Sequence, residues 1–237
     1  LKNPSGPRVV MVSGVAGCGK SGVVREVLKD LDDREVVHLA FRVDQHLECK
    51  SSLDFGKALL GSEESPVTVL KGLSPTQTAV LVVDQLDAIS EISGRNGTSK
   101  NAVLRMIDEA RRYATVRVVL VCRTFDIEND ERIKLLKQSS DFNQVNIPLL
   151  EWEDDVAPLL AKLQVNAEAL DTTQQELLRL PLNLAVFAEI GGAGDTQFAS
   201  RNDLFEKLLR KKQSSIVENR APPGWALMAP LTRLSEW

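Results

Sequence analysis

The sequence predicts an α/β fold, a three-layer sandwich around a parallel sheet, followed by an all-helical domain. Short runs rich in valine and leucine alternate with helical or loop segments over the first 150 residues, which is typical of parallel strands joined by right-handed crossovers. After Pro148 no further strand-like run occurs, and apolar residues recur at helical spacing instead. A glycine-rich loop between the first run and its helix predicts a phosphate site within the sandwich.

Five apolar runs are expected to form the strands of the sheet. They are Arg8–Ser13, Glu35–Val43, Ala79–Asp84, Val116–Cys122 and Phe142–Leu149. The third and fourth are nearly continuous Val/Leu stretches, as expected of strands that are buried on both faces. Helices are expected at Ser21–Leu31 and at Asn101–Tyr113, the second after a polar loop from Ser90 to Lys100.

Three helical regions are expected beyond residue 150. Their apolar residues are, in order, Val156, Leu159, Leu160 and Leu163; then Leu177, Leu178, Leu184 and Phe187; then Leu204, Phe205, Leu208 and Leu209. The first set falls at i, i+3, i+4 and i+7, which gives one apolar stripe on a helix. Pro181 interrupts the second region and marks a helix kink or a helix start.

The segment Gly14-Val15-Ala16-Gly17-Cys18-Gly19-Lys20-Ser21 reads G-x-x-x-x-G-K-S, the P-loop pattern. Its glycines let successive backbone N–H groups point inward at a polyphosphate, and the helix that follows adds its positive end. We expect Lys20 to reach the β- and γ-phosphates and the Ser21 hydroxyl to ligate Mg²⁺. The strand–loop–helix context favours nucleoside triphosphate binding over an ordinary glycine-rich turn.

Two acidic residues follow the third run, at the sheet edge where ligands of open parallel sheets bind. Asp84 ends four apolar residues, a Walker B pattern whose carboxylate holds Mg²⁺ together with Ser21. Asp87 is a candidate to orient or deprotonate the attacking water. The alternatives are a turn or helix N-cap role for Asp84 and a solvated loop carboxylate for Asp87.

Arg123 follows the fourth run and is expected at the same edge of the sheet. A fixed cation there would neutralise charge on the γ-phosphoryl group. The alternative is a surface arginine paired with Asp126 or Glu128. The candidate catalytic residues are therefore Asp87, Arg123 and Lys20.

Composition narrows the classes of partner. The formal net charge of −4 argues against nucleic-acid binding by the whole surface, and no apolar run reaches the length of a membrane span, so we expect a cytoplasmic protein. The three cysteines are too scattered for a disulfide framework or a zinc site, and the two histidines lack metal-type spacing and are expected to be structural.

These motifs resemble the signal-transduction ATPases with numerous domains, the STAND class. The similarity rests on the P-loop, Asp84-Gln85-Leu86-Asp87, Cys122-Arg123-Thr124-Phe125-Asp126 and Leu180-Pro181-Leu182-Asn183-Leu184. The Asp-x-Leu-Asp spacing is similar to that of the NACHT branch. The sequence around Asp84 and around Arg123 resembles that of bacterial anti-phage defence proteins.

The resemblance implies roles that spacing alone does not. Arg123 would sense the γ-phosphate, and Pro181 would pack near adenine and report which nucleotide is bound. Two positions depart from the pattern: Arg179 stands where a Gly-x-Pro motif has glycine, and Ala88 replaces the acid that often follows the second aspartate. Because Asp87 must act without that neighbouring acid, hydrolysis is expected to be slow.

The resemblance also implies the organisation and partners of the protein. We expect an ASCE- or AAA+-like P-loop NTPase domain over residues 1–150, a helical lid over 151–200 and the truncated start of a winged-helix-like or helical region over 201–237. ATP and Mg²⁺ are the expected cofactors. A homo-oligomer is expected in the full-length active state, with fused sensor and effector domains outside this sequence. Leu1 is not an initiator methionine, so we also expect the sequence to be a fragment of a longer polypeptide.

Two alternatives stay open on the sequence. One is an AAA+-like ATPase associated with DNA, which shares the sandwich and the helical lid. The other is an interaction scaffold that binds ATP without hydrolysing it. The choice of ATP over GTP follows the resemblance, since no guanine-reading Asn-Lys-x-Asp run is present.

Overall fold

The computed structural model describes residues 6–90, 97–190 and 198–218, and the chain divides into two compact units. The first unit combines residues 1–16 with 20–147, and the second combines residues 17–19 with 148–237. The division at residue 200 stays a prediction. Residues 219–237, about half of the expected winged-helix-like region, lie outside the described residues.

The first unit is built on a five-stranded sheet in the order β2-β3-β4-β1-β5. Its strands are β1 (Val9–Gly14), β2 (His38–Arg42), β3 (Ala79–Asp84), β4 (Val116–Arg123) and β5 (Phe142–Asn146). Every pairing is parallel. β4 lies between β1 and β3, so the strand of the glycine-rich loop is separated from the strand that ends at Asp84. The predicted fold class is confirmed for this unit.

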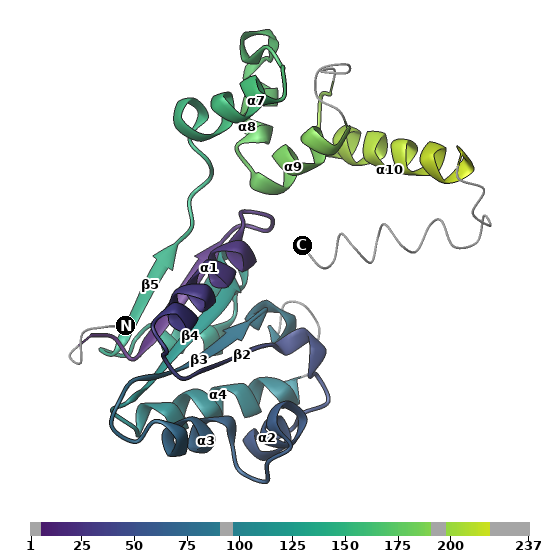
Figure 1. Cartoon of the computed structure of the whole chain (residues 1–237). Helices are drawn as coiled ribbons and strands as arrows, with labels where there is room; N and C mark the ends of the chain where they lie inside the picture. Colours follow the sequence, from purple (N-terminus) through teal and green to yellow (C-terminus); the bar gives the residue numbers. More distant parts are fainter. Residues whose placement is uncertain (1–5, 91–96, 191–197, 219–237) are drawn as a thin grey trace. The chain divides into compact units, whose positions relative to one another are not determined.

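Helices cover both faces of the sheet, which explains why the central strands carry almost continuous apolar sequence. Leu81 and Val83 pack on the face of α2 (Ser52–Leu60), α3 (Pro66–Leu73) and α4 (Gly97–Arg111). Val80 and Val82 point the other way and pack with α1 (Lys20–Asp33). Figure 1 shows α2, α3 and α4 together below the strands and α1 on the opposite side. Burial on two faces is the usual condition of parallel strands.

Capping residues fix the starts of α2 and α3. The Ser51 side chain accepts a hydrogen bond from the Asp54 N–H, and the Asp54 side chain accepts one from the Ser51 N–H, a complete capping box. Ser65 caps α3, and Pro66 occupies its first turn, where a missing N–H does no harm. These signals are present in the sequence, although the sequence analysis assigned no helix to them.

Short helices join the remaining strands of the first unit. They are η1 (Val43–Gln45), η2 (Leu86–Ile89), α5 (Thr124–Asn129) and α6 (Glu131–Leu136). η2 follows β3 after the single residue Gln85, and α5 directly follows β4. Both elements therefore begin at the carboxyl edge of the sheet.

The described residues of the second unit beyond Pro148 form helices only. These are η4 (Trp152–Val156), α7 (Ala157–Lys162), η5 (Ala167–Ala169), α8 (Thr172–Leu178), α9 (Pro181–Ile190) and α10 (Arg201–Glu218). The buried core of these helices includes residues that the helical spacing assigned to apolar helix faces: Leu160, Leu178, Phe187, Leu204 and Leu208. Within the described ranges, no helix is both long enough and apolar enough to cross a membrane.

Several element ends differ from the expected ranges for local reasons. β2 begins at His38 instead of Glu35, because Glu35 has a φ of +54° and lies in a turn. β5 ends at Asn146 instead of Leu149, and Pro148 has no N–H with which to continue a ladder. α4 spans Gly97–Arg111 instead of Asn101–Tyr113; residues 91–96 of the expected polar loop before it lie outside the described residues.

A buried ion pair ties α4 to the start of α6. Lys100 Nζ lies 2.7 Å from both carboxylate oxygens of Asp130, and the two side chains are 2% and 0% exposed. One Asp130 oxygen also accepts the N–H groups of Arg132 and Ile133, which caps α6. Breaking a buried pair leaves one charge without compensation, which is far more destabilising than losing a surface pair.

Lys100→Met is expected to lower the free energy of unfolding by about 3–5 kcal/mol, because the Asp130 carboxylate stays buried without its ammonium partner. The matched control is Lys134→Met, which removes a largely exposed pair with Glu131 at 2.7 Å and is expected to cost under about 1 kcal/mol. Urea unfolding followed by circular dichroism measures both. Equal losses in the two variants would contradict the structural role of the buried pair.

Candidate functional site

The loop that joins β1 to α1 needs glycine at two of its positions. Gly17 and Gly19 have φ angles of +86° and +94°, a left-handed region that residues with a Cβ rarely adopt. Val15 and Ala16 are exposed, whereas the Cys18 side chain is buried at 3% exposure. The turn chemistry expected of a P-loop is therefore present at the two inner glycines.

Lys20 begins α1 and folds back over the loop. Its Nζ donates hydrogen bonds to the carbonyl oxygens of Gly14 at 3.0 Å and Val15 at 2.9 Å. The ammonium group is thus held at the entrance of the loop, where a phosphate would replace these carbonyls as its acceptor.

Ser21 and Asp84 lie together, as the sequence predicted. The Ser21 Oγ donates to Asp84 Oδ2 at 3.3 Å, and the other carboxylate oxygen accepts the Gln85 N–H at 2.8 Å. Burial raises the pKa of Asp84, while the hydrogen bonds from Gln85 and Ser21 oppose that rise. A hydroxyl and a carboxylate are the oxygen donors that Mg²⁺ prefers, so this pair fits a magnesium ion chemically.

Gln85 adopts a left-handed conformation, with a φ of +59°, directly after Asp84. This conformation is strained for a residue with a side chain, and such strain gathers at functional sites. The turn redirects the chain into η2 and carries Asp87 to the edge of the sheet. No sequence signal indicates it, because glutamine is not a residue that favours positive φ.

Arg123 and Asp87 form an ion pair at this edge. Arg123 Nε lies 2.9 Å from Asp87 Oδ2, with the arginine side chain 51% exposed and the aspartate 8% exposed. Burial raises the pKa of Asp87; the Arg123 charge lowers it, and the Asp126 charge raises it again. The alternative of a solvated loop carboxylate at Asp87 is wrong, and Arg123 pairs with Asp87 instead of the proposed surface partners.

Asp126 belongs to the same cluster, a role that the sequence analysis missed. It lies in the first turn of α5, is 5% exposed and acts electrostatically on Asp87. From the sequence, Asp126 was suggested only as an alternative surface partner of Arg123. Its position three residues beyond the end of β4 was the available signal, since this places it at the carboxyl edge.

Pro181 is the first residue of α9 in the second unit, which matches the helix-start alternative. The next residue, Leu182, donates its N–H to the Gly17 carbonyl at 3.1 Å within that unit. The expected contact between Pro181 and adenine stays a prediction.

The geometry of the first unit brings together Lys20, Ser21, Asp84, Asp87 and Arg123. In register, Gly14 of β1 lies opposite Arg123 of β4, so the loop and the arginine share one edge of the sheet. The edge offers a cation and backbone amides for an anion, and oxygen donors for a hard metal ion. This is the set of groups needed to bind a polyphosphate together with a divalent ion.

A family model described as "ATPase family associated with various cellular activities (AAA)" matches residues 10–139, more than half of the chain. The chain belongs to the AAA family. The AAA domain spans β1 through α6 of the first unit. It is therefore a P-loop NTPase domain of a family of ATPases. Comparison with curated proteins gives no match.

Solved structures share the fold of the AAA chain at low sequence identity. Domain III of the replication initiation protein DnaA from Thermotoga maritima is 11% identical with a TM-score of 0.53, over 89% of this chain and 86% of that chain. A chain of the HORMA:CdnC:Trip13 complex from E. coli MS115-1 is 13% identical with a TM-score of 0.50, over 92% and 75%. A STAND protein with a tetratricopeptide repeat sensor from Pyrococcus horikoshii is 15% identical, over 88% of this chain and 31% of that one. Its TM-score of 0.46 carries no weight for the STAND assignment.

Asp84→Asn is expected to stabilise this AAA domain at neutral pH. Because burial raises the pKa of Asp84, ionisation is less favourable in the folded chain than in the unfolded one. The penalty is present above the folded-state pKa and disappears as the pH falls below the ordinary value for aspartate. Asparagine keeps an acceptor for the Gln85 N–H, so the gain in the free energy of unfolding is expected to shrink as the pH falls from 7.5 toward about 4, the ordinary pKa of aspartate.

Urea unfolding of the wild type and the variant across that pH range measures the effect. Glu63→Gln is the control, because Glu63 is 88% exposed and is expected to show little change. A gain for Asp84→Asn that grows toward acid pH would reverse the sign of the argued linkage and count against it.

Proposed function

We propose that this chain is the ATP-binding and slowly ATP-hydrolysing switch module of a STAND-type, NACHT-like signalling protein of bacterial anti-phage defence. Support comes from the residues that carry the resemblance: Asp84-Gln85-Leu86-Asp87, Arg123 and Leu180-Pro181-Leu182. The observation that carries the switch is the 2.9 Å ion pair between Arg123 and Asp87. It gives the candidate sensor a partner in the protein that a nucleotide must displace.

Lys20 and the loop amides bind the phosphates in this proposal, and Ser21 and Asp84 hold Mg²⁺. The chemistry that the ion supplies when bound is neutralisation of charge on the phosphate oxygens. Lys20 exchanges the carbonyls of Gly14 and Val15 for phosphate oxygens. The exchange is favourable because a charge-assisted hydrogen bond between ions is stronger than one to a neutral carbonyl.

Arg123 restrains Asp87 through their ion pair until a γ-phosphate competes for the arginine; we call this restraint the latch. While the guanidinium is bound to it, the carboxylate is a weaker proton acceptor than it would be alone, because the positive charge opposes the rise in pKa that burial causes. A γ-phosphate competes for the same guanidinium, which is 51% exposed and able to turn toward it. Once Arg123 leaves, the pKa of Asp87 rises further under burial and the Asp126 charge, and the carboxylate becomes a better base for water.

Slow hydrolysis follows from this arrangement and from Ala88. Asp87 can act as a base only after Arg123 has left it. No second acidic residue follows Asp87 to assist it, because the next residue is Ala88. With ATP bound, Arg123 would contact the γ-phosphate, and with ADP bound it would stay paired with Asp87. This difference between the two nucleotides is what a switch requires. By family likeness, Pro181 reads adenine, and the response is nucleotide-dependent oligomerisation of the full-length protein with its sensor and effector domains.

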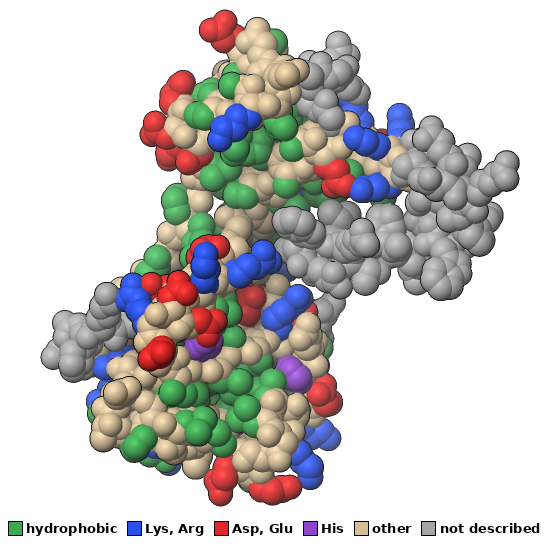
Figure 2. All heavy atoms as spheres, in the orientation of Figure 1, with side chains coloured by type: hydrophobic (Ala, Val, Ile, Leu, Met, Phe, Trp, Pro, Cys, Tyr) green, Lys and Arg blue, Asp and Glu red, His purple; other side chains and the backbone are tan. Residues whose placement is uncertain are grey.

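The DNA-associated alternative has less to favour it. The formal net charge is −4, and Figure 2 shows acidic and basic side chains interspersed on the visible face of the first unit. Binding to a duplex through its phosphates depends on clustered lysine and arginine. The similarity to DnaA concerns the fold alone.

Lys20→Ala is expected to weaken ATP binding by at least about 100-fold, the equivalent of roughly two charge-assisted hydrogen bonds. Isothermal titration calorimetry in Mg²⁺ measures the affinity. Lys29→Ala is the matched control, an exposed lysine on the same helix α1, and is expected to bind as the wild type does. Unchanged affinity in Lys20→Ala would remove the P-loop assignment.

Asp87→Asn is expected to lower ATP turnover by about 10²–10⁴-fold, the usual contribution of a positioned general base. ATP affinity is expected to rise in the same variant, because Arg123 loses the carboxylate that competes with the γ-phosphate.

Arg123→Gln is expected to reduce the preference for ATP over ADP by about tenfold or more, the loss of one charged hydrogen bond. Single-turnover kinetics and calorimetry with both nucleotides give these quantities.

Arg112→Gln serves as the control for Arg123→Gln, since Arg112 is exposed and follows α4 just before β4 begins, away from the carboxyl edge. Reduced ATP affinity in Asp87→Asn would contradict the latch. The absence of turnover in both the wild type and Asp87→Asn would favour the non-hydrolysing scaffold instead.

A further inference from the structure

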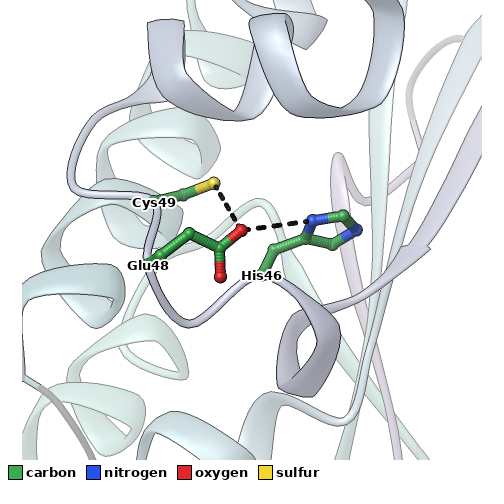
Figure 3. Close-up of side chains that lie close together, drawn as sticks. All are labelled: His46, Glu48 and Cys49. Atoms are coloured by element: carbon green, nitrogen blue, oxygen red, sulfur yellow. Dashed lines mark hydrogen bonds and ion pairs between the residues drawn. The ribbon is translucent and has the colours of Figure 1, made fainter.

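A short loop in the first unit carries three side chains that metal ions use as ligands. Residues 46–49 connect η1 to the loop before α2 and read His46-Leu47-Glu48-Cys49. Sequence spacing gave no reason to group them. Figure 3 shows the imidazole, the carboxylate and the thiol converging on one point.

The separations between these side chains suit a single ion. Glu48 Oε1 lies 3.9 Å from His46 Nδ1 and 3.9 Å from Cys49 Sγ, and all three ligand atoms lie within 4.8 Å of one another. Ligands that lie about 2.0–2.3 Å from a tetrahedral zinc ion are about 3.3–3.8 Å apart. Closing the site therefore needs only small side-chain movements, and the 71% exposed Glu48 is free to make them.

The backbone and the neighbouring rings hold two of the three groups in place. The Cys49 N–H donates to the His46 carbonyl at 3.2 Å, so the turn itself brings the thiol back to the imidazole. The His46 ring packs edge-on against Phe41 and Phe55, each with a centroid separation of 6.2 Å. Ser99 of α4 donates its hydroxyl to the Leu47 carbonyl, which anchors the middle of the loop.

The charge around the thiol is also negative. Cys49 is 3% exposed, and burial, together with the nearby carboxylates of Glu48 and Asp54, raises the pKa of Cys49 to about 11. Asp54 is committed to the N–H groups of Lys50 and Ser51, so it contributes charge without offering a ligand. A cation at this point would offset the negative field, and the thiol proton would pass to solvent as the metal–sulfur bond forms.

We propose that His46, Glu48 and Cys49 bind one zinc-class divalent ion, with water as the fourth ligand. Mixed nitrogen, oxygen and sulfur donors favour zinc over magnesium or calcium, which take oxygen ligands. Three protein ligands and one open position distinguish this site from a closed structural zinc centre. The ion would fix the loop that follows β2, whose last residue, Arg42, pairs in register with Asp84.

Cobalt titration tests the proposal, because Co²⁺ replaces zinc and reports a thiolate ligand by its charge-transfer absorption. The 237-residue chain is dialysed against chelator and titrated with Co²⁺ in excess Mg²⁺, which occupies oxygen-only sites. We expect one equivalent of a thiolate–cobalt band with visible bands of four-coordination, displaced by one equivalent of Zn²⁺. Cys49→Ser is expected to lose the band, whereas Cys122→Ser, which removes another buried thiol, is expected to keep it.

Glu48→Gln keeps the test decisive if Cys49→Ser does not fold, because Glu48 is exposed and its substitution leaves the core intact. Loss of even an outer-shell partner typically weakens metal binding 10–100-fold, so loss of this direct ligand is expected to weaken it by about 100-fold or more. Wild-type chain without a thiolate band, or Glu48→Gln with unchanged Co²⁺ affinity, would overturn the proposal.

Discussion

The parallel pairing of β4 with both β1 and β3 is the constraint on which the candidate site depends. Val83, one residue from the end of β3, lies opposite Leu120, so β4 continues for three more residues beside β1 alone. It ends at Arg123, opposite Gly14. The arginine therefore emerges beyond the end of β3, where η2 presents Asp87. Shifting this register by one residue would turn Arg123 toward the opposite face and separate it from both the loop and the carboxylate.

The sequence predicted those parts of the site that depend on strong local signals. The glycine-rich loop and the apolar runs that lead into Asp84 and Arg123 are such signals, and the geometry of parallel sheets places their ends at one edge. The partner of Arg123 was beyond prediction, because it depends on the left-handed turn at Gln85. Glutamine adopts that conformation only when the surrounding structure imposes it.

Interactions between side chains from separate segments were harder to anticipate. The buried Lys100–Asp130 pair joins residues that are 30 positions apart, and nothing in either local sequence specifies its partner. The grouping of His46 and Cys49 was missed for another reason: their spacing matches no known metal motif, and the turn that joins them has no glycine or proline to announce it. Asp126 is buried beside Asp87, whereas the sequence suggested it only as an alternative surface partner of Arg123.

The two outer strands of the sheet bear on how such a chain associates with copies of itself. β2 and β5 are each five residues long, and β5 is rich in amide side chains, with Asn143, Gln144 and Asn146 along its length. Short edge strands, and in β5 a polar one, are poor templates for another strand, and proteins use them to avoid pairing their sheets edge to edge. In the proposed oligomer, subunits are therefore expected to meet through helices and loops, and each sheet is expected to stay within its own molecule.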